Sequence, residues 1–326
     1  MTALRTLLAL TYVAAQLTHR WLPPPADEED ACALWERTWS GLPELEKLGE
    51  RVWLDLVAWA WSDGAAICPW TGGVERRYGG AGREALARAA SSHFRALTAA
   101  EAGFLALSDP EYPALLRALT DPPLGLTYQG DVQLLSRSCV SVVGSRKASA
   151  LAMRESFTLG RMLAEAGCVV VSGGAFGCDI AAHHGVLALG LLPVPAICVF
   201  AGGLARLYPR GNDAVFQRLG AGHGLFLSER LWEATCRPVD FSARNRIIAG
   251  LAPLTVVMQA ARCSGALVTA RFALDQGREV AVLKHPPGDV RADGSEALLI
   301  DGAMAFASAT ELIKNLNNSN DFNDQI

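Results

Sequence analysis

The chain has 326 residues, of which 51% are hydrophobic and 19% are charged, and its formal net charge is -4. These values are typical of a packed globular protein and exclude a largely disordered chain. The negative net charge excludes a generally basic surface, so an anionic polymer would have to be attracted by a local cluster of cations.

The first part of the chain, residues 1–95, predicts a small helical domain. It holds most of the tryptophans, namely Trp21, Trp35, Trp39, Trp53, Trp59, Trp61 and Trp70. Trp35 and Trp39 are one helical turn apart, which favours the apolar face of a short helix. We expect these rings to fill a core, and the alternatives are stacking on nucleic-acid bases or docking of a partner.

Cysteine usage and hydropathy indicate a cytoplasmic protein. The 8 cysteines form neither a CxxC pair nor a cluster with histidine. We therefore expect free thiols, as in a reducing cytosol, and no metal. The apolar run at residues 7–15 is short and fits a first helix better than a signal peptide, and no run is long enough to span a bilayer. Membrane insertion and a cofactor are not expected.

Residues 105–135 read as a linker in which two proline corners enclose a short helix around 114–116. Strands and helices then alternate. Strands are expected near 139–143, 168–172, 196–200, 224–228, 254–258 and 279–283, and helices near 148–166, 178–190, 212–220, 243–251, 264–276 and 309–316. The strands are continuously apolar, which indicates cover on both faces. The pattern predicts an α/β domain at 96–316 with a doubly wound, mostly parallel Rossmann-like sheet, and a disordered polar tail at 317–326.

Short turns of small residues follow most of the predicted strands, at 144–146, 172–179, 201–203, 228–229 and 264–265. Because the carboxyl ends of parallel strands share one edge, these turns should surround one crevice. Exposed backbone N–H groups at helix starts suit phosphate. The cations expected at the lip of the crevice are Arg146, Lys147, Arg210, Arg244 and Arg246. Arg244 and Arg246 are two residues apart, so they cannot both point the same way from one helix.

Other nucleotide sites and catalytic sites find little support. The first turn lacks GxGxxG spacing and the second strand ends in Ser172 instead of an acidic residue, which disfavours NAD. No GxxxxGK[ST] motif is present, which excludes a Walker-type ATPase. A Ser/His/Glu site can be drawn from Ser172, Ser228, Glu229 and His183, but nothing positions an oxyanion hole, so no catalytic residue is expected.

A set of motifs occurs in a fixed order across residues 105–310. They are VVGSR at 142–146, VSGGAFGCDIAAH at 171–183, AGGL at 201–204, LYPRGN at 207–212, SE at 228–229, FSARNRIIAGL at 241–251, SGALVTA at 264–270, GREV at 277–280 and DGA at 301–303. Together they resemble the DprA/Smf family of DNA-processing proteins. The RNRII and SGxxxTA motifs are the most specific part of the resemblance.

The resemblance implies a homodimer that binds single-stranded DNA without base specificity and performs no turnover chemistry. It further implies protection of incoming strands in natural transformation and help in loading a RecA-type recombinase. Residues expected at the DNA/phosphate surface are Gly144, Ser145, Arg146, Lys147, Ser172, Gly173, Gly174, Phe176, Gly177, Gly202, Arg244, Asn245, Arg246, Ser264 and Gly265. Among them, Asn245 is expected to be a structural hydrogen-bonder. By the same resemblance, the dimer surface is expected at 298–307 and 309–316.

Three positions refine this expectation. Phe176 replaces a Lys or Arg that the family often has, and it would either stack on a base or plug the loop. Gln259 replaces a usual Glu and removes a charge near the crevice. Asp179 is expected to be a helix N-cap, because a carboxylate facing DNA would repel phosphates.

The alternative function is a nucleotide-binding sensor or a nucleotide phosphoribohydrolase-like protein of the related Rossmann-like group. The PGGxGTxxE signature of those hydrolases is absent, and Phe272 stands where their glutamate would follow the threonine. Without that carboxylate, cleavage of an N-glycosidic bond lacks a general acid or a group that stabilises the ribosyl cation.

Overall fold

The computed structural model describes residues 92–107 and 109–318. The predicted Trp-rich helical domain lies outside these residues except for its last four positions, and so does nearly all of the predicted disordered tail. Residues 92–95 belong to a helical segment, 92–99, that packs on the sheet domain. Its His93 Nδ1 accepts a hydrogen bond from the Trp232 N–H at 3.1 Å.

The described residues form one nine-stranded sheet in the order β1-β2-β6-β5-β4-β3-β7-β8-β9. The strands are β1 (Gly103–Ala106), β2 (Gly125–Gln129), β3 (Cys139–Val143), β4 (Val169–Ser172), β5 (Ala196–Phe200), β6 (Leu225–Ser228), β7 (Leu254–Val257), β8 (Glu279–Leu283) and β9 (Met304–Phe306). From β6 to β9 every neighbouring pair is parallel. The predicted doubly wound, mostly parallel fold is confirmed.

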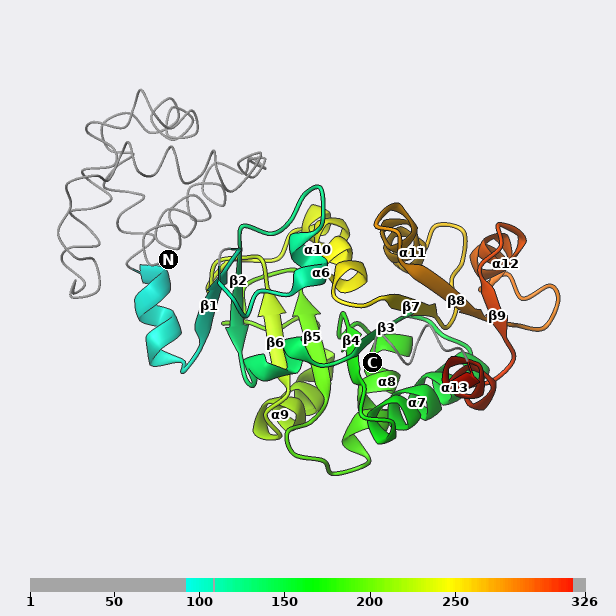
Figure 1. Ribbon diagram of the computed structural model, residues 1–326, viewed down its shortest axis with the longest axis horizontal. Helices are drawn as coiled ribbons and strands as arrows, with labels where there is room; N and C mark the ends of the chain where they lie inside the picture. The colour runs from blue at the N-terminus through cyan, green and yellow to red at the C-terminus, as the bar shows by residue number, and fades with distance from the viewer. Residues whose placement is uncertain (1–91, 108, 319–326) are drawn as a thin grey trace, which may run out of the picture.

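Helices cover both faces of the sheet (Figure 1). The helices are α6 (Ala114–Arg117), α7 (Ala150–Glu165), α8 (Cys178–Leu187), α9 (Asp213–Ala221), α10 (Pro238–Gly250), α11 (Gly265–Asp275), α12 (Asp293–Ile300) and α13 (Ala309–Asn318), with short 3-10 turns η3 (Val132–Ser136) and η4 (Arg210–Asn212). One face carries α7, α8, α9 and α13, and the other carries α6, α10, α11 and α12.

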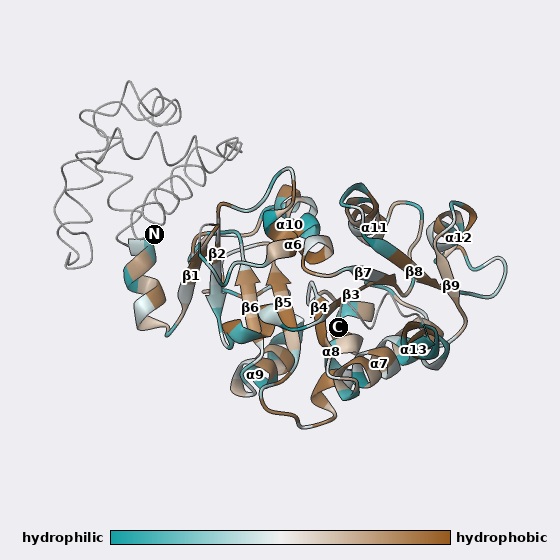
Figure 2. Ribbon diagram, in the orientation of Figure 1, coloured by the Kyte–Doolittle hydropathy of each residue, from teal (hydrophilic) through white to brown (hydrophobic). Residues whose placement is uncertain are grey.

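Alternation along each strand divides the apolar side chains between two cores, because successive residues point to opposite faces. In β3, Val140 and Val142 pack toward α7 and α8, whereas Cys139 and Val143 pack toward α10 and α11. Figure 2 shows the resulting hydrophobic strands between two helix layers. Burial of both faces explains why the parallel strands are mostly apolar in the sequence instead of alternating between apolar and polar residues.

Five elements differ from the prediction. The stretch expected to be a linker contains α6 as foreseen, but also β1 and β2, which extend the sheet antiparallel beyond β6. The helix expected at 243–251 begins at Pro238, where Asp240 accepts a hydrogen bond from the Arg237 N–H at 2.8 Å. Elements α12 and β9 were also not expected.

The site region follows from the strand order. β3 has β4 on one side and β7 on the other, so the chain winds in opposite directions from this point. The loops that leave β3 and β7 diverge to opposite faces of the sheet, to α7 and to α11. Such a topological switch point opens a crevice at the carboxyl ends of the two strands, where ligands bind in open α/β sheets.

Candidate functional site

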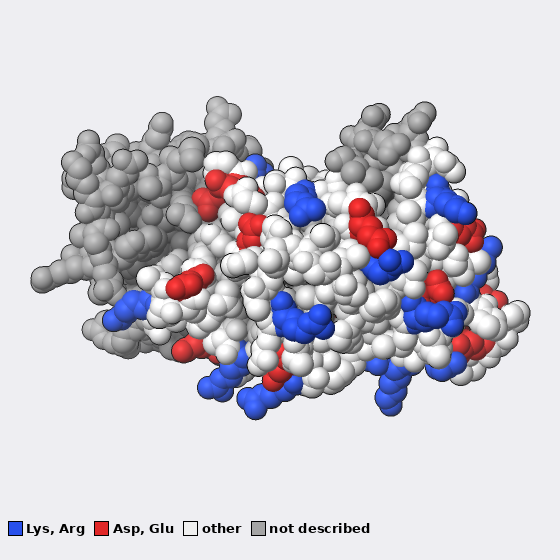
Figure 3. Space-filling view, turned by 90° about the horizontal axis from the view of Figure 1, so that it is seen from below, with Lys and Arg blue, Asp and Glu red and all other residues white. Residues whose placement is uncertain are grey.

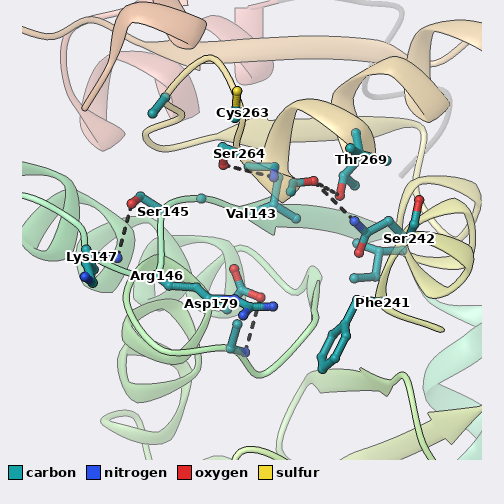
Figure 4. A pocket seen from close by; sticks show the side chains of 18 of the residues that line it. Val143, Ser145, Arg146, Lys147, Asp179, Phe241, Ser242, Cys263, Ser264 and Thr269 are labelled. Atoms are coloured by element: carbon teal, nitrogen blue, oxygen red, sulfur yellow. Dashed lines mark hydrogen bonds between the residues drawn. The ribbon is translucent and has the colours of Figure 1, made fainter. Parts of the chain in front are cut away.

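A cleft of about 830 Å³ lies at this switch point. Figure 4 shows Ser145, Arg146 and Lys147 on one side of it, Phe241 and Ser242 on the other, and Cys263, Ser264 and Thr269 above. These side chains come from the loop after β3, from α10 and from the start of α11. The predicted residues that line the cleft are Gly144, Ser145, Arg146, Lys147, Arg244, Asn245, Ser264 and Gly265.

The loop after β3 supplies positive charge to the cleft, and a further arginine of the lining, Arg291, is paired with Asp289. Arg146 and Lys147 are both exposed and line the cleft. Neither forms an ion pair with a residue of the described ranges. The guanidinium carbon of Arg146 lies 5.2 Å from the centre of the Phe241 ring. This cation–π contact leaves the N–H donors of Arg146 available at the edge of the cleft.

The loop is held in place by the start of α8. The Ser145 carbonyl accepts a hydrogen bond from the Cys178 N–H at 3.3 Å. Gly144 lies so close to Cys178 that a Cβ at Gly144 would be 2.5 Å from the Sγ atom. A Cβ at Gly177 would be 2.0 Å from the Ser145 carbonyl oxygen, and Gly177 has a φ of 82°. Glycine is required at these positions by the close packing of two loops.

The Gly-rich loop between β4 and α8 is bound by a carboxylate of the chain itself. Asp179 accepts hydrogen bonds from the backbone N–H groups of Gly173 at 3.2 Å and Ala175 at 3.3 Å. The expectation that Asp179 is an N-cap was wrong in position, because the cap of α8 is Gly177 and Asp179 lies in the first turn. Burial raises the pKa of the Asp179 carboxyl, and the positive charge of Arg244 acts against that rise.

Arg244 reaches the same loop from α10. Its Nη1 donates to the Gly173 carbonyl at 3.0 Å and also to the Val199 carbonyl at the end of β5. Its side chain is buried, and burial lowers the pKa of the guanidinium while Asp179 raises it. Arg244 therefore lines the floor of the cleft with its hydrogen-bonding groups turned toward the backbone. Its predicted phosphate contact gains no support from this geometry.

Arg246 lies outside the cleft. Its guanidinium forms ion pairs with Glu229 at 2.6 Å and with Asp121 at 3.2 Å. The two arginines of α10 thus diverge, as their spacing predicted. Between them, Asn245 accepts a hydrogen bond from Arg244 Nε at 3.3 Å and donates to the Gly265 carbonyl at 3.2 Å. This arrangement gives Asn245 the structural role expected of it, joining α10 to α11.

The N-terminus of α11 forms the upper wall. The Ser264 hydroxyl accepts a hydrogen bond from the Ala266 N–H at 3.2 Å, which caps the helix. Gln259 does not line the cleft: it is buried, its Oε1 accepts from the Ser149 N–H at 2.8 Å, and its Nε2 donates to Asp289 at 3.3 Å. The Gln259 amide therefore does not face the cleft; it joins Ser149 to Asp289 behind the wall of the cleft.

The remaining predicted residues do not line the cleft; they are Ser172, Gly173, Gly174, Phe176, Gly177, Gly202 and Arg246. Ser172 is buried and donates its hydroxyl to the Val142 carbonyl at 2.6 Å. Gly202 packs closely against Cys236, since a Cβ at Gly202 would be 3.0 Å from the Cβ of Cys236. Phe176 is 45% exposed on the rim beside the cleft. The Gly-rich motif thus builds the support of the cleft, while the first turn and α11 supply its walls.

Sequence reasoning missed one important residue, Phe241, which faces Arg146 across the cleft. The available signal was its place three residues before Arg244, which puts both side chains on neighbouring parts of one helical face. The predicted helix began at 243, so Phe241 appeared to lie before the helix. The Ser/His/Glu site that the sequence disfavoured gains no support: Ser228 donates to the Gly202 carbonyl at 2.7 Å, and His183 is fully buried.

Residues 92–107 and 109–318 contain no cluster of three or more His, Cys, Asp or Glu side chains that could hold a metal ion. None of the helices in this part of the chain has the length and hydropathy needed to cross a membrane.

Comparison with known proteins identifies relatives of the sheet domain. The family model described as DNA recombination-mediator protein A matches residues 103–317. The DNA processing protein DprA of Bacillus subtilis is 36% identical over 212 residues, which are 64% of this chain and 70% of that protein. Protein Smf of Escherichia coli is 36% identical over 205 residues, and the match covers 63% of this chain but 54% of that protein.

Solved structures agree with these relatives. DNA processing protein A from Streptococcus pneumoniae superposes with a TM-score of 0.62 at 31% identity, covering 71% of this chain and 81% of that chain. DNA processing protein A from Helicobacter pylori, studied for its single-stranded DNA binding mode, superposes with a TM-score of 0.60 at 31% identity. That match covers 66% of this chain and 95% of the other.

Proposed function

Because the chain belongs to the DNA recombination-mediator protein A family, we propose that it is a DNA-processing protein that binds single-stranded DNA in the cleft between β3 and β7. The observation that carries this proposal is the pairing of Arg146 with Phe241 across the cleft, 5.2 Å apart. A guanidinium group suits a phosphate, and an aromatic ring beside it suits a base. Together they match the two chemical parts of a nucleotide.

The distribution of charge supports a strand held at one place. On the face shown in Figure 3, Lys and Arg side chains are interspersed with Asp and Glu side chains and separated by uncharged surface. The net charge is -4, so the protein as a whole does not attract a polyanion at long range. Accessible cations at the cleft, Arg146 and Lys147, therefore contribute most of the attraction, aided by backbone N–H groups at the start of α11.

Three predicted residues take a changed role in this proposal. Arg244 and Asp179 shape the floor of the cleft through Gly173, and Arg246 stabilises the fold through Glu229. The phosphate contacts are assigned to Arg146 and Lys147, with Ser145, Ser264 and Gly265 close enough to the opening to take part.

The finer role proposed is protection of incoming strands during natural transformation and loading of a RecA-type recombinase, without turnover chemistry. The B. subtilis and S. pneumoniae relatives are named as DNA processing proteins, which is consistent with this role. We also propose a cytoplasmic homodimer that pairs through 298–307 and 309–316. Ile300, which is 80% exposed, and Met304 lie on that surface and supply apolar area for pairing.

The test of strand binding is a salt titration with oligo-dT of increasing length. We expect the slope of log K against log salt to steepen with length until the site is filled, because each neutralised phosphate releases counterions. Equal affinity for a mononucleotide and a long oligonucleotide would contradict the proposal and favour a nucleotide sensor. Release of free base from a nucleotide would instead favour a hydrolase.

The recombinase role is tested by filament nucleation. A strand coated with single-strand binding protein is mixed with a RecA-type recombinase, with and without this chain. Faster nucleation in its presence supports loading, whereas an unchanged lag contradicts loading and leaves strand binding intact. The oligomeric state is measured by light scattering on the wild type and on an Ile300→Asp variant.

A further inference from the structure

Two large exposed aromatic side chains lie next to residues that line the cleft: Phe176 follows Ala175 in sequence, and Tyr208 contacts Phe241. Tyr208 is 53% exposed and Phe176 is 45% exposed. Phe176 belongs to the loop after β4, and Tyr208 belongs to the loop after β5. Both loops leave the carboxyl edge of the sheet, which is the edge that holds the cleft. Their aromatic rings thus extend the surface of the site away from β3, toward β5.

Tyr208 is joined to the cleft by ring contacts. Its ring centre lies 5.8 Å from that of Phe241, with the planes inclined at 64°. Phe241 in turn lies under the Arg146 guanidinium. Arg146, Phe241 and Tyr208 therefore follow one another from the cleft outward, so a strand with a phosphate at Arg146 has aromatic surface next to it.

Phe176 is fixed to the same surface by contacts between the two loops. A Cβ at Gly211 would be 2.7 Å from Cζ of Phe176, so the ring rests directly on the Gly211 backbone. The next residue, Asn212, donates a hydrogen bond to the Gly174 carbonyl at 2.9 Å. The loop that carries Tyr208 and the loop that carries Phe176 are thus bound together, with one side of the Phe176 ring left to solvent.

The charges around these rings suit a polyanion. Arg206 and Arg210 flank Tyr208 in sequence and are exposed, and neither forms an ion pair with a residue that the structure describes. The acidic residues nearest to the rings in sequence are Asp213, in the first turn of α9, and Asp179, which is buried and binds the backbone of the Gly-rich loop. Glu233 lies beside the loop after β5 in space, because the carbonyls of its neighbours Trp232 and Ala234 accept hydrogen bonds from the N–H groups of Ala205 and Gly203. Aromatic rings flanked by arginines are the combination that single-strand binders use to hold bases and backbone together.

We propose that Phe176 and Tyr208 form a base-stacking platform, which holds the bases of the nucleotides that leave the cleft toward β5. This inference rests on the proposed function and adds a second binding chemistry to the same site. Phosphates are held at Arg146, and the neighbouring bases stack on the platform. Because every base has an aromatic face, such a platform adds affinity without base specificity.

The experiment compares oligo-dT with an abasic oligonucleotide of equal length and equal phosphate number. Binding is measured for the wild type, for Phe176→Ala with Tyr208→Ala, and for a matched Leu192→Ala control. Leu192 is an exposed apolar residue in the loop before β5, at the opposite edge of the sheet. Both rings are partly exposed, so the double variant is expected to fold, which a thermal melt checks.

For the double variant we expect a loss of about tenfold or more on oligo-dT and no change on the abasic strand, because stacking on each ring contributes about 1–3 kcal/mol per base. The Leu192→Ala variant should match the wild type on both strands, and Phe176→Tyr with Tyr208→Phe should retain binding. Equal losses on both strands, or no loss on oligo-dT, would overturn the platform.

A direct measurement keeps the proposal testable if the double variant fails to fold. Wild-type protein is irradiated with oligo-dT that carries 5-iodouracil, and the cross-linked peptides are sequenced. Adducts at Phe176 or Tyr208 support the platform, and adducts confined to other residues contradict it. If the wild type bound no oligo-dT at all, the proposed function itself would be contradicted. Failure of the stacking platform can therefore be told apart from failure of the proposed function.

Discussion

Asp179 and Arg244 bind the same residue, Gly173, from opposite sides. The Asp179 carboxylate accepts a hydrogen bond from the Gly173 N–H at 3.2 Å, and the Arg244 guanidinium donates to the Gly173 carbonyl at 3.0 Å. The two charged groups are buried, and each one favours the charged form of the other. A loop that appears in the sequence as a flexible run of glycines is therefore held rigidly beneath the cleft.

The first prediction concerns Arg146. Replacement by alanine removes an exposed cation that contacts the Phe241 ring and forms no ion pair with residues of the described ranges. We expect the free energy of unfolding to change by less than about 0.5 kcal/mol, while the salt slope for oligo-dT falls by about 1. Arg218→Ala, an exposed arginine on α9, is the matched control and should leave the slope unchanged. An unchanged slope in Arg146→Ala would remove this residue from the strand site.

The second prediction assigns Arg246 to stability. Arg246→Ala leaves Glu229 buried without its closest cation, so we expect a loss of about 3–5 kcal/mol in the free energy of unfolding. Urea denaturation measures it. Arg246→Met combined with Glu229→Gln should recover most of the loss, because the uncompensated charge is gone. If Arg246→Ala were as stable as the wild type but bound oligo-dT with a smaller salt slope, Arg246 would be a phosphate contact instead of a stabilising residue.

The third prediction compares two glycines of the site. A Cβ at Gly173 would be 2.8 Å from Arg244 Nη2, and that guanidinium is held by two carbonyls. Gly173→Ala should therefore cost about 1–3 kcal/mol of stability. At Gly265 the nearest atom would be 4.0 Å away, so Gly265→Ala should be tolerated. Thermal melts of the two alanine variants check this. Equal melting temperatures would show that the Gly173 loop can shift to make room for the added Cβ, which would contradict the prediction.

The fourth prediction is a pH dependence that arises from His183. Burial lowers the pKa of this histidine to about 4, against an ordinary value of 6.5, and its ring nitrogens have no hydrogen-bond partner in the described structure. Between these two pH values His183 is protonated in the unfolded chain but neutral in the native state. The free energy of unfolding therefore falls as the pH drops from 6.5 toward 4. Between about pH 7 and about pH 5 the wild type should lose about 2 kcal/mol more than His183→Leu. Urea unfolding of both proteins at the two pH values measures this difference, and parallel losses would refute it.

Much of the sheet domain was predictable because its strands are buried on both faces. The run that became β5 is apolar throughout, β4 is apolar up to its last residue, Ser172, and β3 is apolar except for Ser141. A small residue begins the turn after each of these strands. The antiparallel strands β1 and β2 were missed because they are short and contain Gly103 and Gly125, which look like turn residues. Here the packing of Tyr128 over Gly103 and Phe104 over Gly125 overrides local preference.

The motifs predicted which residues gather at the cleft more accurately than they predicted what each residue does there. The motifs correctly brought Gly144, Arg146, Arg244 and Ser264 to one cleft. They did not tell that Arg244 and Arg246 are both buried, with Arg244 against the Gly-rich loop, because burial depends on where α10 begins and which face it turns to the sheet. Once α10 starts at Pro238, Arg244 faces the Gly-rich loop and Phe241 faces Arg146. This tertiary information is not contained in residue spacing.

The antiparallel pair β1–β2 has a practical consequence for any shortened version of this protein. The strand–helix alternation starts at β3, which invites truncation just before residue 139. Such a cut would remove β2 from β6 and expose the unpaired backbone groups of a strand whose four residues are all buried. Bare edges of this kind recruit other chains into intermolecular sheets. A fragment that begins at 92 should remain dispersed, whereas one that begins at 137 should precipitate although it retains every residue of the cleft.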